Sequence, residues 1–405
     1  MTADLMMTFN AGSSTVKVGL FEMETGGATR VARGVIDFRA KPLSFRVTEG
    51  PVTFAVDLEA EAADDLTEVL AETLGWLTHH FDMDRIAVIG HRIVHGGDIF
   101  DAPVVLDDRT IQAIDDLTPL APLHQPQSLR LIRAIRKLRP DIEQVASFDT
   151  AFHRTNAPVV RRFAIPRALH DEGIKRYGFH GLSYKFIAGE LKRCAPEVAS
   201  RKVIAAHLGS GASLCGFDEG ASRDVSMSFS TLDGIPMATR CGALDPGVML
   251  HLLGQKHLSP AEIEDMLYHR SGLLGVSGIS ADSRDLIASD RPEAKEALDL
   301  FTFRIAGEIG RIAMSLGGLD AIVFTAGIGE HQPEIRSAVC ARLGWLGAVL
   351  DPAANEANVL RIADTSSRIQ IFVIPTDEEQ VIADEAVAII QTQRQTIAEK
   401  SNGRP

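Results

Sequence analysis

The sequence predicts an α/β protein, because short apolar runs alternate along the chain with longer amphipathic stretches. Its 405 residues suggest two or three domains at roughly 150 residues per domain. The short runs end in Gly, Asp, Asn, His or Pro, as buried strands do; they are Leu5 to Phe9, Ile86 to Ile89, Val145 to Phe148, Val203 to Ala206, Ile322 to Thr325 and Ile371 to Ile374. The longer stretches predict helices at Asp65 to His79, Pro126 to Arg136, Tyr184 to Cys194, Pro260 to His269, Pro292 to Leu316 and Glu379 to Thr392.

A short internal repeat suggests that the two halves of the chain are related. Residues Asn10 to Leu20 align without gaps on His207 to Phe217, so that Gly12, Ser13 and Gly19 match Gly209, Ser210 and Gly216. Each copy predicts a β-hairpin, used once per domain, and chance similarity between glycine-rich turns is the alternative. We expect residues 1–150 plus about 380–405 to form a first domain and residues 151–379 a second one.

Composition and charge narrow the classes of function. Hydrophobic residues make up 45% and charged residues 23% of the chain, an ordinary globular mixture. The net charge of −13 disfavours nonspecific binding to nucleic acid or to anionic membranes. The four cysteines form no C-x-x-C pair, so neither a zinc site nor a disulfide framework is indicated. No apolar run is long enough for a secretory signal or a membrane span, and we expect a cytoplasmic protein.

Several glycine-containing turns are candidates for phosphate or nucleotide binding. Gly12 to Thr15 and Gly209 to Ser213 offer backbone N–H groups and hydroxyls, although neither matches the P-loop or dinucleotide fingerprint and a tight hairpin also explains each. Phe324 to His331 follows a predicted strand and begins a helix, which favours nucleotide contact. Ser280 to Asp285 offers polar groups for a ribose or a phosphate, and a helix cap is the alternative.

The segment from His91 to Gly97 is predicted to be a strand that enters a turn. Alternation places Arg92 and Val94 on one face and both histidines on the other. A guanidinium beside a small apolar side chain suits a short carboxylate, because Arg binds carboxylates bidentately; a structural ion pair is the alternative. A zinc protease motif is excluded, since Arg92 stands where the general-base Glu would be and no helix is predicted.

Carboxylates follow two other predicted strands. Asp149 ends an apolar strand, where open α/β sheets gather ligands, and it either holds Mg²⁺ or caps a helix. Thr376 and Glu379 match a capping box. Glu378 then stays open between metal binding and interaction with the helix dipole.

Two loop histidines and a second arginine complete the candidates. His124 and His180 each follow an apolar residue in a loop and are able to donate to a transferring phosphoryl group, although a loop histidine is usually just solvated. Arg240 lies between small residues. Two arginines would bracket a dianion, and surface ion pairing is the alternative for each.

Taken in order, these segments resemble the acetate kinase family, in the acetate and sugar kinase, heat-shock protein and actin superfamily. The resemblance spans nearly the whole chain, through FNAGSSTVK, GHRIVHGG, LAPLHQP, SFDTAFH, RYGFHG, HLGSGAS, residues 224–246, FTAGIGE and PTDEE. It implies two duplicated actin-like (ribonuclease H-like) domains around a central cleft, and a homodimer. It also implies reversible phosphoryl transfer from ATP to a short-chain carboxylate, acetate foremost, giving ADP and an acyl phosphate with Mg²⁺ (or Mn²⁺) as cofactor.

The resemblance implies a role for each candidate residue. Arg92 and Arg240 would bind the carboxylate and the phosphoryl group, His180 would stabilise the transition state, and His124 would assist. The first domain would carry the acyl and phosphate side, and the second the nucleotide side and the dimer interface. The implied sets are Asp149, Arg92, His180, Arg240 and His124 for catalysis; Arg92, Val94, Leu123, Phe179 and Thr231 for the acid; Asn10 and Glu378, with Asp149, for the metal; Ser13, Thr15 and Lys17 for the first phosphate loop; and Lys17, His207, Gly209, Ser210, Gly211, Asp282, Ser283, Arg284, Gly327, Ile328, Gly329 and Glu330 for the nucleotide.

The chain departs from the family pattern at several of these positions. Ser210 stands where Asn is usual and Ser283 where an aromatic is usual, which leaves nucleotide selectivity open. Leu182 and Tyr184 replace Thr and His in RYGFHGTSH. Thr231 replaces a proline of the acyl pocket, which leaves acetate, propionate or a more polar acid as the substrate. A non-catalytic ATP-binding module of the same superfamily and a metallohydrolase built on the two strand histidines are the competing functions.

Overall fold

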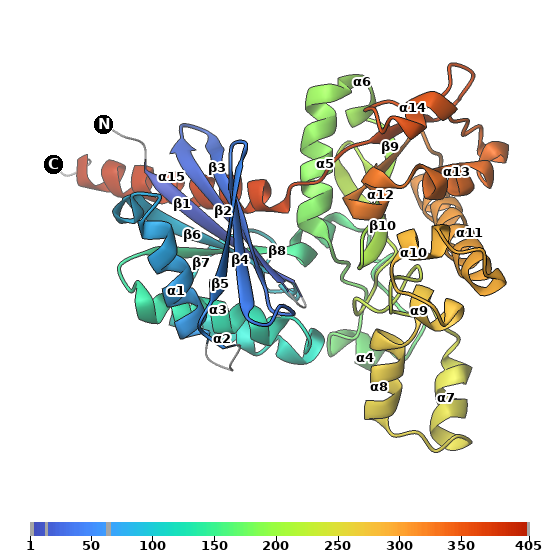
Figure 1. The fold of residues 1–405 in the computed structure, drawn as a ribbon, viewed down its shortest axis with the longest axis horizontal. Helices are drawn as coiled ribbons and strands as arrows, with labels where there is room; N and C mark the ends of the chain where they lie inside the picture. The colour runs from blue at the N-terminus through green and yellow to red at the C-terminus, as the bar shows by residue number, and fades with distance from the viewer. Residues whose placement is uncertain (1–3, 13–14, 62–65, 403–405) are drawn as a thin grey trace. The chain divides into compact units, whose positions relative to one another are not determined.

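The computed structural model describes residues 4–12, 15–61 and 66–402, and the chain divides into two compact units. Unit 1 joins the residues up to Ala151 to the C-terminal residues from Asp377 onward, and unit 2 comprises Phe152–Thr376. Figure 1 shows each unit as a sheet with helices packed on it. Within the described residues, no helix has both the length and the apolar content needed to cross a bilayer.

Unit 1 contains an eight-stranded sheet in the order β5-β4-β3-β2-β1-β6-β8-β7. Strands β1, β6 and β8 run parallel, and the other pairs are antiparallel. The strands are β1 (Leu5–Ala11), β2 (Thr15–Glu24), β3 (Gly27–Asp37), β4 (Leu43–Glu49), β5 (Val52–Leu58), β6 (Ile86–Ile93), β7 (Val104–Val105) and β8 (Glu143–Phe148). The helices are α1 (Thr67–Thr78), α2 (Asp108–Asp115), α3 (Gln125–Leu138) and α15 (Glu378–Asn402), with 3-10 turns η1 (Met83–Arg85) and η2 (Thr118–Leu120). A third 3-10 turn, η3 (Asp149–Thr155), begins in unit 1 and ends in unit 2.

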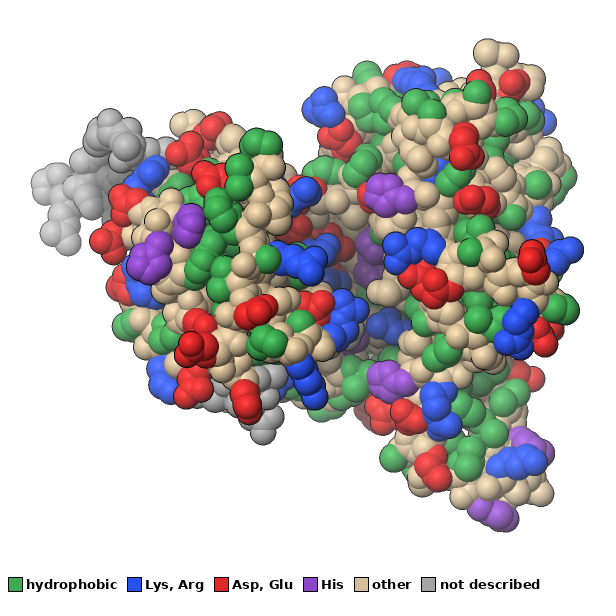
Figure 2. All heavy atoms as spheres, in the orientation of Figure 1, with side chains coloured by type: hydrophobic (Ala, Val, Ile, Leu, Met, Phe, Trp, Pro, Cys, Tyr) green, Lys and Arg blue, Asp and Glu red, His purple; other side chains and the backbone are tan. Residues whose placement is uncertain are grey.

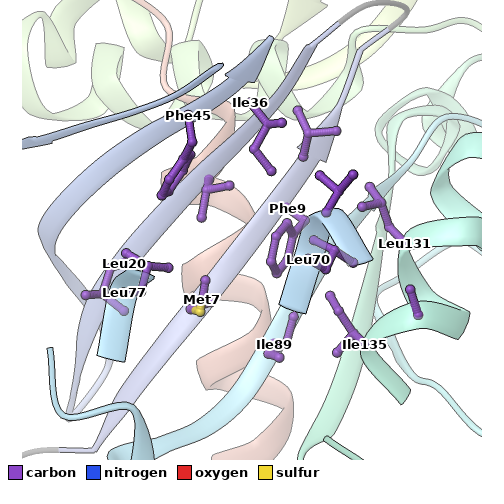
Figure 3. Close-up of a cluster of buried hydrophobic side chains, with 14 of the residues drawn as sticks. Met7, Phe9, Leu20, Ile36, Phe45, Leu70, Leu77, Ile89, Leu131 and Ile135 are labelled. Carbon is purple, nitrogen blue, oxygen red and sulfur yellow. The ribbon is translucent and has the colours of Figure 1, made fainter. Parts of the chain in front are cut away.

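Helices cover both faces of this sheet, because successive strand residues point to opposite sides. On one face, Met7 and Phe9 of β1 pack with Leu70 of α1 and Leu131 of α3 (Figure 3). On the other face, the alternate residues of β1, β6 and β8 pack against α15, through Met6, Val88, Val145, Ala383, Ala386, Val387 and Ile390. The C-terminal helix is therefore part of the core of unit 1.

Unit 2 contains a five-stranded sheet in the order β11-β10-β9-β12-β13, built from β9 (Lys202–Leu208), β10 (Ala212–Asp218), β11 (Ala221–Val225), β12 (Ala321–Thr325) and β13 (Gln370–Val373). Helix α5 (Gly181–Cys194) packs on one face. Helix α11 (Pro292–Leu316) packs on the other, close enough that a Cβ on Gly216 would meet Ile312. The remaining helices are α4 (Arg167–Asp171), α6 (Pro196–Ala199), α7 (Pro246–Gly254), α8 (Pro260–His269), α9 (Gly272–Ser277), α10 (Ser283–Ile287), α12 (Ala326–His331), α13 (Pro333–Ala341), α14 (Pro352–Glu356) and the 3-10 turn η4 (Gly344–Leu346).

The two units share one strand plan. In unit 1 the order β3-β2-β1-β6-β8 has antiparallel pairs on one side of β1 and parallel pairs on the other, and β11-β10-β9-β12-β13 repeats that pattern in unit 2. The prediction of one hairpin per half is confirmed, since β1 pairs with β2 and β9 with β10. This duplication makes the fold class of the sequence analysis visible in the strand order alone.

The ungapped alignment of the two hairpins is wrong beyond the turn. Asn10 pairs with Lys17, whereas its counterpart His207 pairs with Ser213. The second turn is therefore one residue shorter, and Gly19 does not correspond to Gly216. A one-residue slip sends every following side chain to the opposite face of a sheet, so only the first strand and the start of the turn are equivalent.

Candidate functional site

Three polar residues gather on the α15 face of unit 1 because of strand periodicity. Asn10, Arg92 and Asp149 each lie four residues beyond an apolar residue that packs on α15, namely Met6, Val88 and Val145. With a period of two, they continue the same rows toward the carboxyl ends of β1, β6 and β8. The N-terminus of α15 begins at Glu378. The amide of Asn10, the guanidinium of Arg92 and the carboxylate of Asp149 therefore lie together near the N-terminus of α15.

The Arg92 guanidinium is held from two sides. Its Nε donates to Asp149 Oδ1 and Oδ2 at 3.2 Å and its Nη2 donates to Oδ2 at 2.6 Å. Its Nη1 donates to Asn10 Oδ1 at 3.0 Å. Three of its five N–H groups are engaged in this way, and the remaining two lie on Nη1 and Nη2. Asp149 and Asn10 are buried, so the orientation of Arg92 is fixed by a charge-assisted, bidentate contact.

Two glutamates from α15 close the cluster. The Asn10 Nδ2 donates to Glu378 Oε2 at 2.8 Å and to Glu379 Oε1 at 2.6 Å. Lys17 Nζ lies 3.8 Å from Glu379 Oε1, and Arg92 Nη1 lies 3.7 Å from Glu378 Oε2. Both carboxylates therefore face β1 and β2.

The capping box predicted for Thr376 and Glu379 is wrong. The carboxylate of Asp377 accepts from the backbone N–H of Gln380 at 3.0 Å and caps the helix. Glu379 instead contacts Asn10 and Lys17. The local sequence pattern fits the capping box, but the polar ends of β1 and β2 offer Glu379 an amide and a cation that a helix terminus alone does not.

The charges of this cluster leave an acidic excess. Burial by itself lowers the pKa of Arg92, but the carboxylates of Asp149 and Glu378 outweigh it and raise that pKa above its ordinary value. The pKa of Lys17 is also raised, chiefly by Glu379. Three carboxylates therefore face two permanent cations, and the donors on offer are carboxylate and amide oxygens, which hard divalent cations prefer.

The donor set fits a metal that is shared with a substrate. In the described part of the chain, no three His, Cys, Asp or Glu side chains are gathered closely enough to bind a metal unaided. A magnesium ion usually takes one or two carboxylates together with substrate phosphates and water. Asp149 and Glu378, with the amide of Asn10, match that lighter requirement.

The other unit 1 candidates lie just after β6 and just before α3. Val94 is buried just after β6, Leu123 is 41% exposed, and His124 is half-buried at the residue before α3. Ser13 of the first phosphate loop lies outside the described residues, and Gly12 N donates to Thr15 O at 2.8 Å across that turn.

His91 lies in β6 and His95 lies two residues beyond the end of that strand, and both are buried. The ring of His91 stacks on Phe9 at 5.8 Å and its Nε2 contacts Gln144 Oε1 at 2.8 Å. Burial lowers the pKa of both His91 and His95 to about 4. A metal at His91 would have to displace Gln144, so the structure gives the metallohydrolase hypothesis no support.

Two stacked imidazoles dominate the polar cluster of unit 2. The rings of His180 and His207 lie 4.3 Å apart and are nearly parallel. The Nδ1 of His180 contacts Ser213 Oγ at 2.8 Å, and the Nδ1 of His207 contacts Ser183 Oγ at 2.8 Å. Each ring is thus held through Nδ1 by a buried serine. The Nε2 atoms lie beside the glycine turn that follows β9, 3.5 Å from a Cβ built on Gly211 for His180 and 3.8 Å from one built on Gly209 for His207.

Gly211 keeps a small space open beside these rings. A Cβ built on Gly211 would lie 3.5 Å from His180 Nε2 and 3.7 Å from Arg240 Nη1. Two nitrogen atoms, His180 Nε2 and Arg240 Nη1, therefore lie close to the position that any side chain larger than that of glycine would occupy. The same Nη1 donates to the backbone oxygen of Thr231 at 3.1 Å.

Arg240 differs from Arg92 in its charge balance. Within the residues that the structure describes, no carboxylate pairs with Arg240; burial lowers its pKa, and the ring of Tyr268 lies 6.0 Å away. A partly buried cation without an anionic partner is unfavourable unless a ligand supplies one. The geometry at Gly211 and this charge together indicate an anion site.

The loop that carries His180 has a strained backbone. Gly178 and His180 have φ values of 88° and 56°, and left-handed backbone is uncommon for a residue with a side chain. The Nε2 of His153 contacts the carbonyl of Phe179 at 3.0 Å, and a Cβ on Gly178 would lie 2.6 Å from His153. Burial lowers the pKa of His153 to about 4, so its neutral ring donates to that carbonyl and fixes the loop.

The candidate nucleotide residues are mainly bound to one another. Asp282 caps α10 by accepting from Arg284 N at 2.9 Å, and the Arg284 guanidinium folds back on the same carboxylate. Ser283 is buried. Glu330 Oε1 accepts from the backbone N–H groups of Ala326 at 2.7 Å and Thr376 at 3.2 Å. For the stretch Ser280 to Asp285, the structure therefore shows the helix cap that was the alternative to ligand binding.

The turn after β9 and the start of α12 hold the other candidates. Gly209 N donates to Gly211 O at 3.2 Å, and the carbonyl of Ser210 accepts from Ala238 N at 3.3 Å. Gly329 packs against the strand, 3.5 Å from Ala206 O for a built Cβ. Gly327 and Ile328 lie in the first turn of α12 (Ala326–His331).

Sequence reasoning missed the roles of three residues in these clusters. Glu379 was assigned to a cap, although its position next to Glu378 at a helix start was a usable signal. Ser213 was predicted only as the last residue of a phosphate-binding turn, and Ser183 gave no signal, because a serine near a glycine turn has many ordinary explanations. Their roles appear only when β9, β10 and α5 bring them to the histidines.

Comparison with known proteins identifies one family that matches nearly the whole chain. The profile of the acetokinase family matches residues 5–384. Acetate kinase from Rhodopseudomonas palustris strain TIE-1 is 45% identical over 386 residues, covering 94% of this chain and 97% of that protein. Acetate kinase from Rickettsia felis is 38% identical over 388 residues, with coverages of 96% and 100%.

Two solved structures are also similar. A propionate kinase from Francisella tularensis superposes with a TM-score of 0.87 at 34% identity, covering 94% of this chain and 98% of that one. Porphyromonas gingivalis acetate kinase gives a TM-score of 0.85 at 32% identity, with coverages of 96% and 100%.

Proposed function

This chain belongs to the acetokinase family, and on that premise we propose that it transfers the γ-phosphoryl group of ATP reversibly to acetate, giving ADP and acetyl phosphate. The match over residues 5–384 carries the proposal. The buried cluster around Arg92 and the anion site beside Gly211, where His180 Nε2 and Arg240 Nη1 converge, are two further observations that support it. Direct in-line transfer needs little covalent help from a protein, but it needs positioning and charge stabilisation.

Arg92 is proposed to bind the acetate carboxylate. Asp149 and Asn10 engage three of its N–H groups, and the two left on Nη1 and Nη2 match the two oxygens of a carboxylate. Acetate is ionised at neutral pH, since a simple carboxylic acid has a pKa near 4. The carboxylate is itself the nucleophile, and the reaction needs no general base.

From the family resemblance, we expect the acyl chain to be contacted by Val94, Leu123, Phe179 and Thr231. His124 is proposed to assist in transfer.

A divalent cation, Mg²⁺ or Mn²⁺, is proposed to be held by Asp149 and Glu378 with Asn10. When bound, it would screen the phosphate charges that oppose approach of the carboxylate. The carboxylate of Asp149 would then contact the cation as well as the Arg92 guanidinium that it orients.

His180 and Arg240 are proposed to stabilise the transferring phosphoryl group. Their Nε2 and Nη1 atoms converge beside Gly211, which is the arrangement that charge spread over equatorial phosphoryl oxygens requires. The two arginines suit different tasks: Arg92 is oriented by the Asp149 carboxylate to bind an acid, whereas Arg240, with no carboxylate partner among the described residues, is suited to receive an anion.

Unit 2 is proposed to bind the nucleotide and unit 1 to provide the acyl and phosphate side. His207 and the turn from Gly209 to Gly211 would contact phosphates through N–H groups, with Ser210 among them. Lys17 of unit 1 would reach a phosphate as a point charge. The segments Asp282 to Arg284 and Gly327 to Glu330 would lie on the adenosine side.

A homodimer through unit 2 is proposed from an exposed apolar stripe. Phe303 and Met314 of α11 are 56% and 72% exposed, and Trp345 is 74% exposed. Gly310 lies between the first two on one helix face, and a Cβ there would be 4.0 Å from Trp345. Sedimentation of the wild type and of Trp345→Ala tests this assembly, since a dimer should dissociate more readily in the variant.

The test of function is an acyl phosphate assay. Purified protein is incubated with Mg²⁺, ATP and acetate, propionate, butyrate or glycolate, and hydroxylamine traps any acyl phosphate as a hydroxamate. We expect the highest kcat/KM with acetate, dependence on the divalent cation, and loss of activity in folded Arg92→Ala and Arg240→Ala. Full activity in either folded variant would remove that residue from the mechanism. ATP binding without product from any acid would favour the non-catalytic module.

Propionate is the second candidate acid. A similar structure is titled a propionate kinase, and Thr231 stands where the resemblance places a proline. The ranking of propionate against acetate in the same assay decides between them.

A further inference from the structure

The Nδ1 side of His180 is attached to a second buried hydroxyl. Ser213 Oγ, which lies 2.8 Å from His180 Nδ1, also contacts the phenol oxygen of Tyr184. Tyr184 and Ser213 are both fully buried, on α5 and β10. Tyr184, Ser213 and His180 therefore form one chain of hydrogen bonds that ends at a proposed catalytic ring.

The direction of this chain follows from the acidity of its members. A phenol is a stronger acid than an aliphatic alcohol and so the better donor. In the direction that this acidity favours, Tyr184 donates to Ser213 Oγ, and the single proton of that serine is directed to Nδ1 of His180. An imidazole that accepts at Nδ1 carries its proton on Nε2 when it is neutral.

We propose that Tyr184 and Ser213 are positioning residues that hold His180 as the neutral tautomer protonated on Nε2. This inference deepens the proposed function and rests on it, because it assigns how His180 presents a donor to the phosphoryl group. The Nε2–H then points toward the space beside Gly211, where a built Cβ lies 3.5 Å from Nε2. A fixed donor aimed at developing charge needs no reorganisation during the reaction.

The neighbouring ring favours the same state. His207 stacks on His180 at 4.3 Å, so two charged imidazoles would repel each other strongly. A parallel chain holds His207, since Ser183 Oγ contacts both His207 Nδ1 at 2.8 Å and Thr376 Oγ1 at 2.9 Å. Two hydroxyl chains therefore orient two stacked rings with their Nε2 atoms toward the glycine turn.

Tyr184 is also a place where this chain departs from the family pattern it resembles, which has His there. The tyrosine ring packs among Phe152, at 6.4 Å, and His153, at 5.9 Å. Packing accounts for the ring, whereas the contact of its hydroxyl with Ser213 accounts for a tyrosine rather than a phenylalanine. Removal of the oxygen alone therefore separates the two contributions.

The first test reads the tautomer directly and does not depend on activity. Full-length protein labelled with ¹⁵N-histidine is compared with His180→Asn to assign the ring, and two-bond nitrogen–proton correlations report which nitrogen carries the proton. We expect Nε2–H in the wild type and in Ser213→Thr, and an Nδ1–H population in Ser213→Ala. An Nδ1–H signal in the wild type, or no change in Ser213→Ala, would overturn the proposal.

The second test separates positioning from folding. We expect Ser213→Ala and Tyr184→Phe to lower kcat roughly tenfold to a hundredfold, less than the hundredfold to thousandfold typical for loss of a donor itself, with KM nearly unchanged. Ser213→Thr should restore most of kcat. Tyr177→Phe is the matched control, because that hydroxyl donates to Gly173 O at 2.8 Å, away from the chain.

The outcomes distinguish the two proposals. A wild type that makes no acyl phosphate but shows the expected tautomers would refute the proposed function and leave the hydrogen-bond chain standing. An active wild type whose kcat is unaffected by Tyr184→Phe and by Ser213→Ala would refute the positioning role alone.

Discussion

Substitution of Gly211 by alanine should fill the anion site beside Gly211 without destabilising the fold. The three nearest atoms to a built Cβ are at 3.5 Å and 3.7 Å, which is ordinary van der Waals contact, and the backbone of Gly211 does not have positive φ. We therefore expect Gly211→Ala to fold normally. Loss of glycine's freedom in the unfolded chain favours the folded state by about 0.4–1 kcal/mol.

The methyl group should nevertheless block catalysis. An oxygen that accepts from both His180 Nε2 and Arg240 Nη1 needs to lie about 2.7–3.2 Å from each nitrogen. A carbon only 3.5 Å and 3.7 Å from those nitrogens takes that place and displaces the oxygen by roughly 1 Å. A misplacement of that size costs about a hundredfold in rate, or about 3 kcal/mol of transition-state stabilisation.

The measurement is kcat/KM in the acyl phosphate assay, with thermal unfolding on the same samples. Gly189→Ala in α5 is the matched control: nothing lies within 4 Å of its built Cβ, and a helical Gly-to-Ala change stabilises by roughly 0.5–1 kcal/mol without an effect on rate. If folded Gly211→Ala retained kcat/KM within about threefold of the wild type, the phosphoryl group would not bind at this point.

Three further changes test other parts of the structure. Gly90→Ala places a Cβ 2.6 Å from Ile382, and we expect it to lower the free energy of unfolding by about 1–3 kcal/mol in urea titrations, whereas Gly75→Ala, with open space, should not. Burial lowers the pKa of His153 to about 4 from 6.5, so its stabilising contribution is complete above pH 6.5 and disappears as the pH falls to 4; the stability gap to His153→Gln should narrow by about 2 kcal/mol between pH 7.5 and 5. Thr231→Pro restores the proline that the family pattern has in the proposed acyl pocket and should lower the propionate-to-acetate ratio of kcat/KM by up to about tenfold. An unchanged value in any of these three measurements would count against the corresponding assignment.

The parallel core strands and the long helices were predictable because their signals are local. Pro292–Leu316 and Pro260–His269 have the predicted bounds, since proline at the first helical turn and a run of apolar periodicity mark both ends. Strands β3, β4 and β5 were missed. They belong to the half of the sheet that carries polar residues on one face, where alternation over seven to eleven residues is a weaker signal than a continuous apolar run.

The sequence predicted the candidate residues whose chemical role follows from the residue type. It did not predict roles that depend on which side chains a residue contacts in the fold. Arg92 and Asp149 were both chosen from sequence, but a structural ion pair was the stated alternative to ligand binding for Arg92. The structure contains that ion pair, at 2.6 Å. The two interpretations are compatible, because an arginine oriented by a buried carboxylate keeps N–H groups for a ligand.

The serines beside the histidines show the limit of sequence reasoning more sharply. Ser213 faces His180 only because the second hairpin turn is one residue shorter than the first, so that His207 pairs with Ser213 rather than with Leu214. The side chain of Ser213 then lies on the face of the sheet that α5 covers, as the contact with Tyr184 requires. A one-residue difference in a turn thus decides whether a hydroxyl or an apolar side chain lies beside His180, and no pattern in the sequence fixes that length before the pairing is known.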